Sequence, residues 1–153
     1  MRITEFLDKS GVKYEVSKHP VAFSAQTMAA TMHESGKFVA KPVLVKADDK
    51  YLLCVLAASY KIDLQALKRQ LSAKSVELAT EDEVGRLFPD CELGAEPPFG
   101  NLYDVTTIMD KSLEKDDHIT FQAGSHEKAI RMSMADFRKL ANPRVMEFSY
   151  HAG

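Results

Sequence analysis

The sequence lacks the features that mark several large protein classes. Its longest apolar run, YLLCVLAASY at residues 51–60, is about half as long as a membrane-spanning helix must be. The first eleven residues, MRITEFLDKSG, form a charged amphipathic pattern without the apolar segment of a signal peptide. The two cysteines, Cys54 and Cys91, form no CxxC pair. These absences predict a cytoplasmic protein with reduced thiols and no membrane partner.

Familiar catalytic and cofactor-binding motifs are also missing. The chain has no GxxxxGK[ST], GxGxxG, HExxH or GxSxG sequence. A Cys–His hydrolase is disfavoured, because Cys54 lies in the apolar run and acidic neighbours would raise the pKa of the Cys91 thiol. No metal and no cofactor are predicted, because the histidines show no metal-ligand spacing with the cysteines; they are His19, His33, His118, His126 and His151.

The net charge of −2 argues against a broad nucleic-acid-binding surface. Residues 37–74 carry eight Lys or Arg and three Asp or Glu, whereas residues 75–100 carry one Arg and seven acids. This separation of charge allows at most a local basic patch that binds an anion. A separation of this kind more commonly reflects ordinary charged surfaces in contact with water. With 45% hydrophobic and 27% charged residues, the 153-residue chain has the composition of one globular domain.

Apolar spacing and cap residues predict a mixture of helices and strands. Because the two types do not alternate strictly and no linker appears, we expect a single α+β domain over residues 1–153, with a mixed, mostly antiparallel, curled sheet flanked by helices. Pro42 should lie at an edge or a bulge of its strand. The first expected helix carries Ile3, Phe6 and Leu7 and stops at Gly11, and the others are 24–33, 63–71, 80–88 and 133–141. The expected strands are 12–19, 37–46, 50–59, 76–79, 103–110, 118–124 and 128–133.

Lys41 lies within a mostly apolar strand, in FVAKPVLVK at residues 38–46. A lysine there is usually an edge-strand charge whose stem packs and whose ammonium reaches water. Its alternative role is a cation that projects into a concave site and meets an anion. The spacing alone favours the edge-strand role.

The segment GAEPPFG, residues 94–100, holds an unusual amount of rigid backbone. Two glycines flank two consecutive prolines and a phenylalanine, which excludes a helix and makes a central strand unfavourable. A surface loop is the more common use of these residues. The alternative is a backbone wall whose N–H groups face a ligand oxygen, with Gly94 allowing the ligand to approach closely.

A third segment, Gly124-Ser125-His126, joins two expected strands. Such a turn with an exposed histidine is most often only a hairpin. A histidine at a loop tip can also position water or a hydroxyl group near neutral pH.

These segments, in this order, resemble the YbaK / ProX family of aminoacyl-tRNA deacylases, the editing domain also inserted in bacterial prolyl-tRNA synthetases. VAKPVLV resembles the family's lysine-containing strand, and GAEPPFG resembles its GxxxP element, with Gly94 and Pro98 as the ends. Further similarity lies in HP at 19–20, in YLLCVLAASYKIDLQAL and in DKSLEKDDHITFQAGSHEKAIRMSMADF. The resemblance covers about residues 12–141, and the C-terminal RVMEFSYHAG matches no family element.

The resemblance implies a set of site residues. Lys41 takes the place of the family lysine that contacts the acceptor end of tRNA. Gly94 corresponds to the glycine whose backbone helps to hold the aminoacyl carbonyl, and His126 to a histidine found in part of the family. The residues expected to contribute to substrate binding are Pro98, Gly100, Gly124 and Ser125.

The implied activity is trans-editing: metal-independent hydrolysis of the ester between tRNA and a wrongly attached small amino acid, with Ala or Cys expected. Fixed N–H donors would stabilise the oxyanion that forms when water attacks the ester. The implied partners are the tRNA acceptor end and an aminoacyl-tRNA synthetase. Two alternatives remain open: a non-catalytic module of the same fold that binds tRNA ends or nucleotides, and a hydrolase of small molecules.

Overall fold

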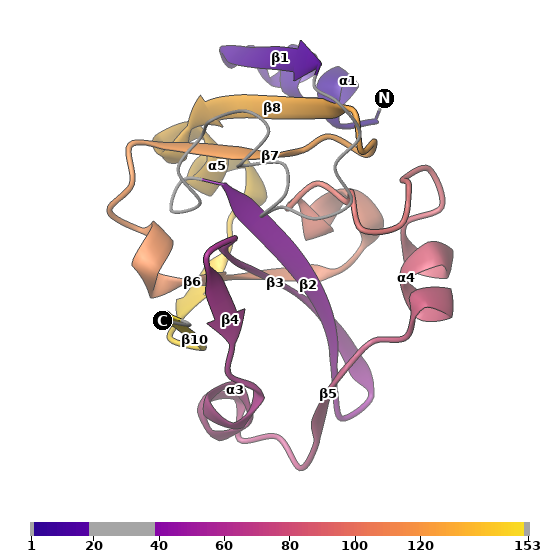
Figure 1. Ribbon diagram of the computed structural model, residues 1–153, viewed down its shortest axis with the longest axis vertical. Coiled ribbons are helices and arrows are strands. Elements are labelled where there is room, and N and C mark those ends of the chain that lie inside the picture. The colour runs from indigo at the N-terminus through magenta and orange to yellow at the C-terminus, as the bar shows by residue number, and fades with distance from the viewer. Residues whose placement is uncertain (1, 19–38, 152–153) are drawn as a thin grey trace.

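The computed structural model describes residues 2–18 and 39–151, which form an α+β domain (Figure 1). The expected helix at 24–33 and the His19-Pro20 pair lie outside these residues. The described elements are α1 (Arg2–Ser10), β1 (Tyr14–Lys18), β2 (Ala40–Ala47), β3 (Lys50–Ala57), β4 (Tyr60–Ile62), α3 (Leu64–Leu71), β5 (Val76–Leu78), α4 (Glu81–Leu87), η1 (Gly100–Tyr103), β6 (Thr106–Asp110), η2 (Lys111–Leu113), β7 (His118–Gln122), β8 (Lys128–Ser133), α5 (Met134–Ala141), β9 (Arg144–Met146) and β10 (Ser149–His151). None of the helices in this part of the chain is long and apolar enough to cross a membrane.

The strands form three sheets among the described residues, where the sequence predicted one curled sheet. The largest has the order β5-β2-β3-β6-β9, the second β1-β8-β7 and the third β10-β4. Pairing is antiparallel except between β3 and β6 and between β6 and β9. A single parallel bridge between Val39 and Thr120 connects the first two sheets. The predicted α+β class with mixed, mostly antiparallel pairing is confirmed.

Local signals correctly placed the four α-helices that the structure describes. The Asp63 side chain caps α3 by accepting a hydrogen bond from the Ala66 amide, and Ser133 caps α5. Thr80 and Glu83 form a reciprocal capping box at the start of α4. Gly11 ends α1 at a φ of +71°, a conformation that costs glycine little.

The main core lies between the β1-β8-β7 sheet, the upper part of β2 and β3, and helices α1 and α5 (Figure 1). A second core fills the space between the five-stranded sheet and α3, and it includes Phe148 from the C-terminal segment. A third, smaller core lies beneath α4 around Phe88 and Tyr103. One face of the large sheet is therefore covered by the second sheet together with α1 and α5, and the other by α3 and the C-terminal segment.

Pro42 lies where the sequence predicted, at a part of β2 that has a strand partner on one side only, where it is opposite Val55 of β3. β5 pairs only with residues 45–47 of β2, and the bridge to β7 is at Val39, so Pro42 falls between these two contacts. The missing N–H of proline is tolerated there because no described strand pairs with that edge.

Candidate functional site

The loop from α4 to η1 combines an exposed tip with a buried base. Glu92, Leu93 and Gly94 are exposed, whereas every residue from 95 to 100 is buried. Gly94 has a φ of +88°, in the region that favours glycine over residues with a side chain. GAEPPFG is therefore neither a helix nor a surface loop throughout, but a buried segment that carries Gly94 at its edge.

Phe99 and Gly100 fix the base of this loop. The Phe99 ring makes edge-to-face contacts with Phe6, Phe121 and Phe137, at centroid distances of 5.9, 5.7 and 5.2 Å. A side chain at Gly100 would collide with the Val105 carbonyl oxygen and lie 2.7 Å from Thr107 Oγ1. The glycine at 100 is thus explained by close packing, and Pro98 is buried beside it.

Four hydrogen bonds tie the loop to the turn between β7 and β8. They run from the Glu92 amide to the Gly124 carbonyl (2.8 Å), from the Gly124 amide to the Ala95 carbonyl (2.8 Å), from the His126 amide to Glu92 Oε1 (3.3 Å), and between His126 Nε2 and the Leu93 carbonyl (2.7 Å). Two of the three segments singled out in the sequence are therefore brought together.

His126 differs from the expectation of an exposed side chain, because only 5% of the residue is accessible to solvent. The Leu93 carbonyl can only accept, so Nε2 carries the proton in this contact. His126 consequently holds the tip of the loop in place. The turn is further shaped by Gly124, with a φ of +88°, and by Ser125 Oγ, which accepts a hydrogen bond from the Glu127 amide at 3.1 Å.

Glu96 is a buried acid that the sequence analysis did not select. Its side chain is 8% exposed, and Oε2 has no hydrogen-bond partner among the described residues. Burial raises the pKa of the Glu96 carboxyl, whereas the backbone N–H groups of Glu96 and Gly94 and the nearby His126 ring oppose this rise. An acid in a Pro/Gly segment is ordinarily solvated, so no local signal could have revealed its burial.

Most amides of the loop already have acceptors inside the protein. The amides of Ala95, Phe99 and Gly100 bond to the Glu92 carbonyl, the Pro97 carbonyl and Thr107 Oγ1. The Gly94 amide is directed toward the Glu96 carboxyl group. A substrate oxygen at Gly94 would therefore share this donor with Glu96, which modifies the prediction of a wall of unoccupied N–H groups.

Lys41 lies half-buried on β2, opposite Leu56 of β3. No hydrogen bond or ion pair joins it to another described residue, including the loop at Gly94 and the turn at His126. Partial burial, followed by repulsion from Lys61 on β4, lowers the pKa of the Lys41 ammonium. Two neighbouring lysines without an acidic partner among residues 2–18 and 39–151 favour an anion such as a phosphate, and Lys61 was not singled out in the sequence.

Both cysteine thiols have a raised pKa, and for Cys91 the main cause is burial rather than the acidic neighbours that the sequence indicated. Burial raises the pKa of the Cys54 thiol to about 12. Burial also raises the pKa of the Cys91 thiol to about 11, and Asp90 and Glu96 add to this effect. Among residues 2–18 and 39–151, no group of three or more His, Cys, Asp or Glu side chains has the arrangement of a metal site.

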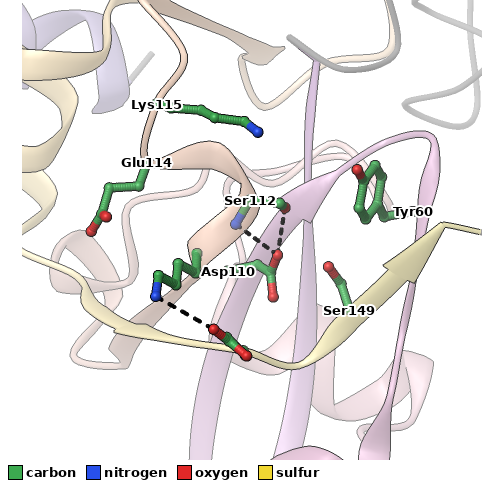
Figure 2. A pocket seen from close by; sticks show the side chains of 8 residues that line it. Tyr60, Asp110, Ser112, Glu114, Lys115 and Ser149 are labelled. Atoms are coloured by element: carbon green, nitrogen blue, oxygen red, sulfur yellow. Dashed lines mark hydrogen bonds and ion pairs between the residues drawn. The ribbon is translucent and has the colours of Figure 1, made fainter.

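A pocket of about 540 Å³, lined by polar and charged residues, lies elsewhere, between β4, η2 and the C-terminal segment (Figure 2). Within it, Asp110 accepts hydrogen bonds from the Ser112 amide and hydroxyl and from the Phe148 amide, and Lys111 lies 3.5 Å from Glu147. These contacts fasten the C-terminal segment to the sheet. The pocket is lined by none of the residues predicted for the site; its lining is Tyr60, Asp110, Lys111, Ser112, Glu114, Lys115, Glu147 and Ser149.

Known proteins are similar to this chain in sequence and in fold. The multifunctional Ser/Thr-tRNA deacylase ProXp-y of Escherichia coli K12 is 26% identical over 152 residues, which cover 96% of this chain and 90% of that protein. The proline–tRNA ligase of Bacillus subtilis is 30% identical over 99 residues, 62% of this chain but 17% of the ligase.

Two solved structures have the same fold. Hypothetical protein APE2540 superposes with a TM-score of 0.88 at 16% identity, over 98% of this chain and 100% of the other. A candidate trans-editing enzyme for prolyl-tRNA synthetase superposes with a TM-score of 0.85 at 18% identity, over 97% and 95% of the two chains. The family model of the aminoacyl-tRNA editing domain matches residues 19–140. The resemblance seen in the sequence is thereby confirmed, and the chain belongs to the aminoacyl-tRNA editing domain family.

Proposed function

We propose that this protein is a trans-editing hydrolase that removes a small amino acid from mischarged tRNA. The observation that carries the proposal is the set of hydrogen bonds that joins the Gly94 loop to the Gly124–His126 turn. It supports a common site for two segments that resemble functional elements of the family. The match over 90% of the E. coli deacylase supports a protein that acts in trans, apart from a synthetase.

In the proposed reaction, water attacks the ester carbonyl, the bond to the ribose oxygen breaks, and the amino acid leaves as a free acid. Gly94 lets the ester approach the backbone, and its amide donates a hydrogen bond that stabilises the developing oxyanion. His126 keeps the loop tip in position through Leu93. Lys41 holds a phosphate at the acceptor end, with Lys61 beside it.

The decisive experiment is deacylation of a panel of charged tRNAs. The sequence analysis predicts Ala or Cys as the amino acid, and the name of the E. coli relative makes Ser and Thr the necessary comparisons. We expect at least one of Ala-, Cys-, Ser- and Thr-tRNA to be hydrolysed well above the uncatalysed rate, and tRNA carrying a bulky aromatic amino acid to remain intact. Binding of these tRNAs without hydrolysis would support the non-catalytic alternative instead.

Deacylation should not depend on a metal ion. The expected result is an unchanged rate after dialysis against EDTA, because the proposed chemistry uses backbone donors and Lys41 rather than a Lewis acid. The measurement is the initial rate with the preferred aminoacyl-tRNA before and after chelation. A loss of activity that Zn²⁺ or Mg²⁺ restores to the protein, with the tRNA refolded separately in Mg²⁺, would contradict the prediction.

A further inference from the structure

Glu96 is a buried acid whose carboxyl group the protein satisfies only in part. Removing a carboxylate from water is unfavourable unless the protein pairs it, and buried acids are consequently almost always bonded to cations or several donors. Glu96 Oε2 has no hydrogen-bond partner among the described residues, although the side chain is only 8% exposed. The protein therefore retains one buried carboxylate oxygen, Oε2, that no described group satisfies.

The loop does not need Glu96 to hold its shape. Phe99 and Gly100 anchor its base in the core. Its tip is held by the other acid of the loop, Glu92, which is exposed and accepts the His126 amide. Two glutamates in one loop thus have different surroundings: Glu92 is exposed and accepts the His126 amide, whereas the buried Glu96 carboxyl faces the backbone N–H groups of Glu96 and Gly94 and leaves Oε2 without a partner among the described residues.

The position of Glu96 indicates a ligand. It lies two residues after Gly94, whose amide is directed toward the Glu96 carboxyl, so the carboxyl is next to the exposed glycine. In an aminoacyl ester, the α-nitrogen is attached to the carbon beside the ester carbonyl. We propose that Glu96 binds the α-ammonium group of the aminoacyl ester through Oε2. This inference rests on the proposed function, because it takes the ester carbonyl to lie at Gly94.

The chemistry of the two groups is complementary. An ionised carboxylate only accepts hydrogen bonds and an ammonium only donates them, so the pair forms strong charge-assisted bonds. The Gly94 and Glu96 amides and the His126 ring favour the ionised carboxyl against the effect of burial. Recognition of the α-ammonium would be independent of the amino-acid side chain. It would also separate aminoacyl-tRNA from peptidyl-tRNA, whose corresponding nitrogen is a neutral amide.

The test compares one aminoacyl-tRNA with its N-acetylated form, which lacks the positive charge. Wild-type protein should hydrolyse the free form preferentially, after subtraction of each uncatalysed rate. In Glu96→Gln the ratio of the two kcat/KM values should fall by about tenfold, since a charge-assisted bond is replaced by a neutral one. In the matched control, Glu127→Gln, the same charge is removed from the exposed neighbour of His126, and the ratio should not change.

Two further measurements separate this inference from the proposed function. Calorimetry with a non-hydrolysable amide analogue of aminoacyl-adenosine, free or N-acetylated, reports α-ammonium binding without catalysis, and Glu96→Gln should remove the preference for the free amine. Glu96→Gln should also melt at the same or a higher temperature near neutral pH, because it removes the cost of burying a charge whose Oε2 has no partner among the described residues. If the wild-type protein hydrolyses neither ester, the proposed function is wrong, and the calorimetry still tests the role of Glu96. An unchanged ratio and unchanged amine preference, or a clearly lower melting temperature, would overturn the role of Glu96.

Discussion

Replacing Gly94 with alanine should lower the deacylation rate by about 100-fold while the protein remains folded. Gly94 has a φ of +88°, and a side chain in this region strains the backbone by about 1–2 kcal/mol. The added methyl group would also stand where the ester approaches the loop tip, and a small displacement of a reacting group is sufficient for a loss of this size. Single-turnover hydrolysis and thermal unfolding measured on the same preparation test both parts of the expectation.

Gly11→Ala is the matched control for this experiment. Gly11 has a φ of +71°, ends α1, and has no atom within 4 Å of the position that a new Cβ would occupy. It should therefore show a similar fall in melting temperature, roughly 2–4 °C for each kcal/mol in a domain of this size, with unchanged activity. If both variants lose stability alike and both keep full activity per folded molecule, Gly94 is only a turn residue.

Removing the ammonium group of Lys41 should weaken the binding of aminoacyl-tRNA. Loss of a charge-assisted contact to a phosphate is worth about 1.5–3 kcal/mol, so Lys41→Met should reduce kcat/KM by about tenfold to a hundredfold. Most of the change should appear in KM, because the contact to the acceptor end is present before and during the reaction. Lys41→Arg keeps the charge and should recover part of the loss.

The stability of Lys41→Met should not fall. The Lys41 ammonium has no ion pair with a described residue, and its pKa is lowered by burial and by Lys61, so the charged form is less favourable in the folded protein than in the unfolded chain. Lys46→Met is the control on the same strand, because its ammonium lies 3.9 Å from Glu83 and away from the proposed site. Equal activity of the two methionine variants would assign Lys41 to the edge of the sheet only.

The Gly94 loop shows where local sequence signals are sufficient. Consecutive prolines restrict the backbone, and glycine at 94 predicts an unusual dihedral angle, which the structure has at +88°. Phe99 was recognised as part of the segment, but its place among Phe6, Phe121 and Phe137 depends on three elements distant in the chain. The rigidity of the loop was therefore predictable, whereas its anchoring in the core was not.

Glu96 and Lys61 show what sequence reasoning missed. Both are charged residues that would ordinarily be assigned to solvent. The loop that buries Glu96 is held by a turn about 30 residues later, through bonds to Gly124 and His126. Lys61 is placed near Lys41 by the packing of β4 against the large sheet. Burial and proximity of this kind arise from long-range packing, so they leave no pattern in the neighbouring residues.

The sequence by itself determined the elements whose causes are local. Cap residues and apolar stripes defined α1, α3, α4 and α5, and the order of three unusual segments indicated the family, which the comparison over residues 19–140 confirmed. Only the tertiary structure decided that the strands form three sheets and that residues 144–151 add β9 and β10 to two of them. It alone decided that His126 is buried and that Glu96 keeps an unpartnered oxygen among the described residues. The physical reason is that helix formation depends on residues three or four positions apart, whereas burial and strand pairing depend on segments that meet only when the chain has folded.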